Sequence, residues 1–102
     1  MTMRLALIAL SWVLLAVDPA AAVIDCSRVT SNADRLVCSS DRLAAAEERM
    51  ALAFRQAMRR GVDRDKLIAT QREWNANVRE LCNQVDCLLR AYEDRAAELD
   101  NF

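Results

Sequence analysis

The four cysteines of this chain are the residues whose type and spacing allow the most chemistry. They fall into two pairs, with eleven residues inside the first pair and four inside the second: Cys26, Cys38, Cys82 and Cys87. A four-thiolate zinc site favours pairs separated by two residues, and the chain has no histidine. A redox pair of cysteines has the same short spacing and lies beside a strand and a helix. No segment of this chain shows the alternation of apolar and polar residues that is typical of a strand. The spacings therefore favour structural disulfides.

The first 22 residues predict the compartment in which the protein functions. Arg4 precedes a short apolar run over residues 5–17, and a run of alanines ends at Ala22. This order is typical of a secretory signal peptide, since a membrane span needs about 20 apolar residues. We expect a signal peptide over residues 1–22 and an exported domain over residues 23–102, periplasmic or extracellular. After cleavage we expect no stable membrane anchor, and an uncleaved anchor is the alternative.

Two segments in the first half of the exported chain predict helices. Ser31 is followed three residues later by Asp34, which is typical of a helix start, and a short helix would end near Cys38. Ser40 then begins a long helix that Gly61 ends, because serine caps helix N-termini and glycine adopts the conformation that follows a C-terminus. Its inner face, at three- and four-residue steps, would hold Leu43, Ala46, Met50, Ala53 or Phe54, and Ala57.

Two further helices are expected after the glycine. Asp63 caps one that extends to about residue 82, with Leu67, Gln71, Trp74, Val78 and Leu81 on its inner face. The last begins near Asp86 and carries Leu88, Tyr92, Arg95 or Ala96, and Leu99 on one face. Short connections make successive helices antiparallel. The sequence thus predicts an all-α fold, a small antiparallel three-helix bundle with a short preceding helix.

This topology brings all four cysteines to one end of the bundle, which they would staple. An exported domain of this size buries only about 60–65% of its unfolded surface, so its core alone gives marginal stability. An even number of cysteines in an oxidising compartment normally forms disulfides. Sequence distance favours Cys26–Cys38 and Cys82–Cys87, and the two crossed pairings stay open because four cysteines allow three connectivities.

Counting residues from the shared end predicts which side chains lie at one level of the bundle. At 1.5 Å per residue, Glu47, Trp74 and Arg95 fall into one layer. We expect Trp74 packed in its middle and Glu47 paired with Arg95 at its edge. The neighbouring layers would hold Met50, Gln71 and Leu99 on one side, and Leu43, Val78 and Leu88 or Tyr92 on the other.

The order of these residues resembles the LprI-type lysozyme inhibitor family of small exported helical proteins. The similar segments are "IDC" (24–26), "DRLVC" (34–38), "QREW" (71–74) and "CLLRAYEDRAAEL" (87–99), and they span most of the exported chain. The resemblance marks a framework of Glu47, Gln71, Trp74, Tyr92 and Arg95. The chain departs from the family pattern at Asp34, Glu47, Phe54 and Arg79, and the last falls one position later than the family's arginine.

The resemblance implies inhibition of lysozyme, of the c-type or another class, through protein–protein binding. Lysozymes are usually strongly cationic, so a negative patch would raise association rate and orient the complex. The last helix offers candidate partner-binding residues: Asp86, Glu93, Asp94 and Glu98. The competing interpretation is a solvated helix in which Arg90 pairs with Asp86 and Asp94 at four-residue spacing.

Other classes of function lack the residues they need. Nucleic-acid binding calls for a concentrated basic surface, whereas the net charge is −1 before and after removal of residues 1–22. With no histidine and no nucleophile beside a base, we expect no catalytic, cofactor-binding or metal-binding residues and no enzyme activity. A generic exported helical interaction or envelope protein is the alternative function. Oligomeric state is left open.

Overall fold

A computed structural model describes residues 24–102, so the expected signal peptide lies outside the described residues. The helical elements in order are η2 (Cys26–Arg28), α1 (Asn32–Ser39), α2 (Asp41–Arg59), α3 (Arg64–Asn77), η3 (Arg79–Leu81) and α4 (Val85–Asp100). No strand occurs in residues 24–102, which confirms the all-α class. Within this part of the chain, every helix is too short or too polar to cross a bilayer.

The helices α1, α2 and α3 begin, and α2 ends, at residues that the local sequence chemistry predicts. The hydroxyls of Ser31 and Ser40 accept hydrogen bonds from backbone N–H groups at the starts of α1 and α2, at 3.1 and 3.3 Å. The Asp63 carboxylate accepts one at 3.1 Å at the start of α3. Gly61, with a φ of +83°, turns the chain after α2, a conformation that side chains with a Cβ rarely adopt.

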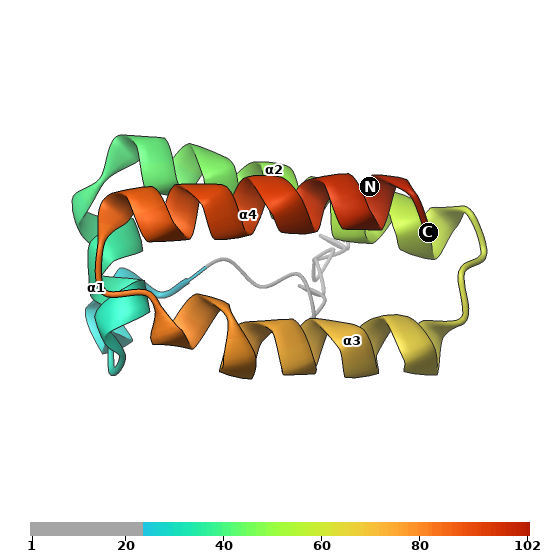
Figure 1. Ribbon diagram of the computed structural model, residues 1–102, viewed down its shortest axis with the longest axis horizontal. Coiled ribbons are helices and arrows are strands. Elements are labelled where there is room, and N and C mark those ends of the chain that lie inside the picture. Colours follow the sequence, from blue (N-terminus) through green and yellow to red (C-terminus); the bar gives the residue numbers. More distant parts are fainter. Residues whose placement is uncertain (1–23) are drawn as a thin grey trace, which may run out of the picture.

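The three long helices alternate in direction, so α2 and α4 run parallel (Figure 1). These two lie side by side along their length. α3 runs antiparallel to them on one side, and α1 crosses at the end where α2 and α4 begin (Figure 1). The arrangement confirms the expected antiparallel three-helix bundle with a short preceding helix.

The core lies mainly between α2 and α4 and is closed on one side by α3. α3 contributes only Leu67 and Trp74 as buried residues. The largest of the completely buried side chains are Leu43, Phe54, Leu67, Leu88, Tyr92 and Leu99. The expected inner faces of the first and last long helices are therefore confirmed.

The expected end of α3 is wrong. The helix stops at Asn77, and Val78 leaves helical geometry with φ −123° and ψ −64° before the short η3. This break rotates the following residues, so that Val78 and Leu81 are 43% and 70% exposed whereas Arg79 is 5% exposed. Burial of Arg79 is compensated because its guanidinium finds hydrogen-bond partners on other elements.

Candidate functional site

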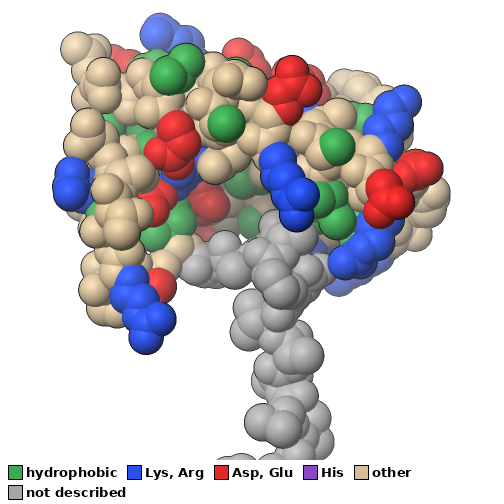
Figure 2. Space-filling model, turned by 90° about the horizontal axis from the view of Figure 1, so that it is seen from below, with side chains coloured by type: hydrophobic (Ala, Val, Ile, Leu, Met, Phe, Trp, Pro, Cys, Tyr) green, Lys and Arg blue, Asp and Glu red, His purple; other side chains and the backbone are tan. Residues whose placement is uncertain are grey.

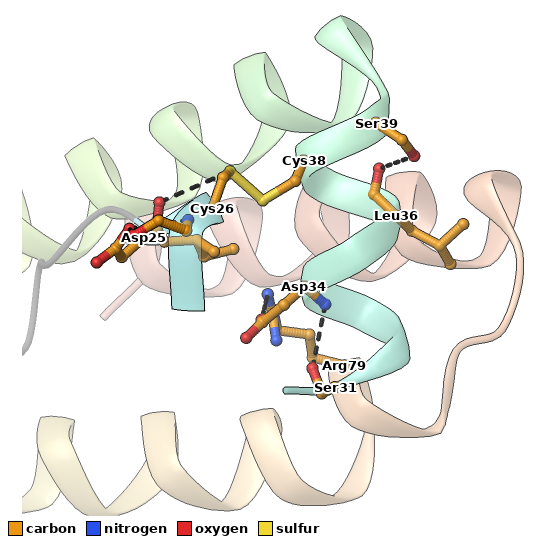
Figure 3. The surroundings of a disulfide bond; sticks show 10 residues. Asp25, Cys26, Ser31, Asp34, Leu36, Cys38, Ser39 and Arg79 are labelled. Atoms are coloured by element: carbon orange, nitrogen blue, oxygen red, sulfur yellow. Dashed lines mark hydrogen bonds and ion pairs between the residues drawn. A yellow bond between two sulfur atoms is a disulfide. The ribbon is translucent and has the colours of Figure 1, made fainter. Parts of the chain in front are cut away.

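Both disulfides lie at the end of the bundle where α1 crosses. Cys26–Cys38 joins η2 to α1 with a Cα–Cα distance of 5.7 Å (Figure 3). Cys82–Cys87 closes the connection between η3 and α4 with a Cα–Cα distance of 5.5 Å. The favoured pairing is confirmed over the two crossed ones. We call this end the disulfide pole.

Arg79 is the centre of the polar contacts at the disulfide pole. Its Nη2 donates to Asp34 Oδ1 of α1 at 2.6 Å, and its Nε donates to the Tyr92 hydroxyl of α4 at 2.7 Å. Its Nη1 donates to Glu80. Figure 3 shows Asp34 and Arg79 lying against each other on the side of α1 that faces η3. One side chain thus connects α1, η3 and α4.

Glu47 of α2 completes this cluster without a hydrogen bond of its own to the arginine. Its Oε2 lies 3.9 Å from Arg79 Nε and, although buried, has no hydrogen-bond partner. Burial raises the pKa of the Glu47 carboxyl above its ordinary value, and the neighbouring Tyr92 hydroxyl and Arg79 charge only partly oppose the rise. Burial and the charge of Glu47 likewise raise the pKa of the Tyr92 hydroxyl.

The expected pair between Glu47 and Arg95 is therefore wrong. Arg95 is 3% exposed, but its Nε donates to Gln71 Oε1 at 2.9 Å and its Nη2 donates to Thr70 Oγ1 at 3.0 Å. Its Nη1 lies 3.1 Å from Glu98 Oε2. The break after α3 brings Arg79 to Glu47 instead, which leaves Arg95 to connect α4 with α3.

The other framework residues lie where the sequence places them. Trp74 and Tyr92 are both buried, with ring centroids 5.7 Å apart and planes tilted by 51°. Gln71 Nε2 lies 3.2 Å from Met50 Sδ, so these two share a layer as expected. The five framework residues hence brace the interior, and none of them offers an exposed contact surface.

The candidate partner-binding residues lie outside the interior. Asp86, Glu93, Asp94 and Glu98 are all exposed on α4. Glu98 is engaged by Arg95, whereas the other three carboxylates form no ion pair within residues 24–102. Arg90 forms no ion pair with Asp86 or Asp94 in the described part of the chain, although all three side chains are exposed as a solvated helix face would have them.

The face of the molecule seen in Figure 2 carries mixed charge. Figure 2 shows Lys and Arg side chains interspersed with Asp and Glu side chains over the face seen from below. In the described residues no group of three or more histidine, cysteine or acidic side chains is placed to hold a metal ion.

Arg79 is the structurally central residue that sequence reasoning missed. It lies off the helical stripe that passes through Trp74, and neither proline nor glycine marks the break at Val78. A signal was nevertheless present. Asp34 follows the expected start of the short helix and Glu47 was expected in an inner layer, and carboxylates that face inward require a buried cation.

No protein family model, curated protein or solved structure matches this chain.

Proposed function

We propose that the exported domain is a lysozyme inhibitor-like protein that acts by protein–protein binding, with the outer face of α4 as its contact surface. The observation that carries the proposal is the set of carboxylates on α4 that lack a partner within the described residues: Asp86, Glu93 and Asp94. Unpaired exposed carboxylates are available to a cationic protein such as lysozyme.

The opposite face of α4 supports this role by making the helix rigid. Leu88, Tyr92 and Leu99 are almost completely buried, and Arg95 connects the helix to α3. A helix held on its inner face presents its outer carboxylates with little loss of conformational entropy on binding. The resemblance to the LprI-type family supplies the class of partner.

The disulfides support export, the compartment in which an inhibitor would meet lysozyme. Two bridges in one small domain are typical of secreted and periplasmic proteins. A protein of the cell envelope that blocks lysozyme would protect peptidoglycan from cleavage.

A generic exported interaction protein is the alternative function. The residues that carry the family resemblance, such as Trp74, Tyr92 and Arg95, are buried and brace the fold. The same framework would serve any partner, and the disulfide-closed bundle would then act only as a scaffold.

The test is a turbidity assay of cell-wall lysis. Oxidised protein, purified after export of the full chain, is added at increasing dose to lysozymes of several classes. We expect slower lysis with at least one class, and more strongly at low salt because screening weakens the attraction. Unchanged lysis with every class would leave the generic interaction protein as the better reading.

A matched pair of variants locates the contact surface. Glu93→Lys combined with Asp94→Lys reverses two carboxylates on α4, and we expect the dose for half inhibition to rise about tenfold. The control combines Glu48→Lys on α2 with Glu73→Lys on α3, both exposed and outside any ion pair of residues 24–102. An equal loss in the control would point to net charge rather than α4.

A further inference from the structure

A shallow groove runs along the seam between α2 and α4, and no residue of α3 lines it. Its apolar lining comes from the small side chains of Ala45 and Ala46 on α2 and from Leu89 and Tyr92 on α4. Arg42 and Arg49 form the rim on the α2 side, and Glu93 forms the rim on the α4 side. Among the residues that line the groove, the charged side chains are therefore positive on α2 and negative on α4.

The two rims extend beyond the groove as charged stripes. Arg42 and Arg49 are seven residues apart, as are Asp86 and Glu93, and Asp100 lies seven further along α4. Seven residues make almost two turns, so residues at this spacing share one edge of a helix. All five side chains are exposed. No ion pair within residues 24–102 involves any of them.

We propose that the groove is the interface of a homodimer in which two copies pack seam to seam, related by a two-fold axis parallel to α2 and α4. Because α2 and α4 run parallel (Figure 1), this axis places α2 of one copy over α4 of the other without shifting their levels. Arg49 then faces Glu93 of the second copy, and Arg42 faces its Asp86. Every pair forms twice.

Charge complementarity singles out a second copy as the occupant. The positive rim and the negative rim line the same stretch of groove, so the surface is complementary to itself under the two-fold axis. Alanines on the floor let the two backbones approach closely, as small residues do wherever helices pack tightly. Such an assembly would be a four-helix arrangement around Ala45, Ala46 and Leu89.

The dimer does not depend on lysozyme binding. It would cover Asp86 and Glu93 but leave Asp94 and Glu98 accessible, because these lie further around α4. Exposed ion pairs are weak individually and are screened by salt. We therefore expect association at high protein concentration that weakens as salt is added.

Sedimentation equilibrium of the exported, oxidised protein from micromolar to millimolar concentration tests the proposal. We expect the mean mass at low salt to approach twice that of one chain. Arg49→Glu and Glu93→Arg should each weaken self-association about tenfold or more, since each reverses one charge in both symmetric pairs. An equimolar mixture of the two variants should regain the dimer, because each reversed charge then meets its opposite on the other chain.

The mixing experiment also excludes the explanation that a variant loses self-association because its own fold is damaged, since mixing two damaged chains would not restore the dimer. Arg42→Glu with Asp86→Arg gives a second pair for the same experiment if either first variant fails to fold. Arg72→Glu and Glu73→Arg on the exposed face of α3 serve as controls and should leave dimerisation unchanged. A wild-type protein that stays monomeric throughout, or a dimer that both rim variants leave intact, would overturn the proposal.

Discussion

Among the described residues, the Glu47 carboxyl is the buried side-chain group that lacks hydrogen bonds. Its buried Oε2 has no hydrogen-bond partner, and burial raises the pKa of its carboxyl. The folded state therefore binds a proton at Glu47 more readily than the unfolded chain does. At pH values below the ordinary carboxyl pKa, this proton contributes fully to the stability of the folded state. The contribution is lost as pH rises through the higher pKa that Glu47 has in the folded state.

Glu47→Gln should consequently stabilise the protein at neutral pH. The substitution removes a buried charge at nearly constant volume, and its amide can donate to a neighbouring carboxylate. We expect the free energy of unfolding to rise by about 1 kcal/mol, the lower end of the cost of an unpaired buried polar group. The gain should shrink as pH falls and the folded wild type takes up a proton at Glu47. Urea denaturation at neutral pH and at lower pH measures it.

The exposed neighbour Glu48 provides the control for this prediction. Glu48→Gln changes the same net charge without altering the disulfide pole and should have almost no effect. If Glu47→Gln lowers stability at neutral pH, the attraction between Glu47 and Arg79 outweighs the cost of burying the carboxylate.

Arg79→Met should have the opposite effect and a larger one. It leaves the carboxylates of Asp34 and Glu47 facing the interior without their cation, and breaking a buried pair from one side costs about 3–5 kcal/mol. Chemical denaturation measures the loss. Arg90→Met, which removes an exposed arginine outside any ion pair of residues 24–102, should change stability by less than about 0.5 kcal/mol.

At the scale of elements, α3 is the long helix that buries the fewest side chains. It buries only Leu67 and Trp74, and its polar contacts to the rest of the bundle centre on Arg95. Local opening costs least where few apolar side chains are buried. α3 should therefore open more readily than α2 or α4.

Amide hydrogen exchange followed by mass spectrometry tests this order. We expect amides of residues 64–77 to exchange at least tenfold faster than those in the centre of α2. Arg95→Met should accelerate amide exchange in α3 further and leave amide exchange in α2 nearly unchanged. Uniform exchange across the three long helices would show that the bundle opens as one unit.

The sequence predicts these elements well where local chemistry decides. Ser40, Asp63 and Gly61 mark helix ends because capping and positive φ depend on neighbouring residues alone. The end of α3 was not predictable in this way, since Val78 has no strong local preference against helix. The break is coupled instead to burial of Arg79, whose partners lie on α1 and α4.

The candidate site was predictable to a similar degree. Helical periodicity identified Trp74, Tyr92 and Arg95 as inward-facing and placed the α4 carboxylates outside. It could not assign partners to the buried arginines, because the break at Val78, which neither proline nor glycine marks, brings Arg79 rather than Arg95 to Glu47. The charged stripes of α2 and α4 were visible as seven-residue spacings, but their adjacency depends on the parallel packing of these helices.

At the scale of the whole molecule, we expect both disulfides to contribute to stability. Replacing Cys26 and Cys38 with alanine should cost about 3 kcal/mol, whereas replacing Cys82 and Cys87 should cost about 2 kcal/mol, because the second bridge closes a shorter loop. Thermal and urea denaturation of both double variants and of the reduced wild type measures these losses. Equal heat resistance after reduction would contradict the role given to the bridges.

Because each bridge closes within its own half of the chain, no sulfur atom links the part before Gly61 to the part after it. A protease that cuts once at this turn would thus yield two fragments that separate on a denaturing gel without any reductant. Either crossed connectivity would keep the fragments together until reduction. After such a cut, only non-covalent contacts across the bundle would hold the two fragments together in the folded molecule.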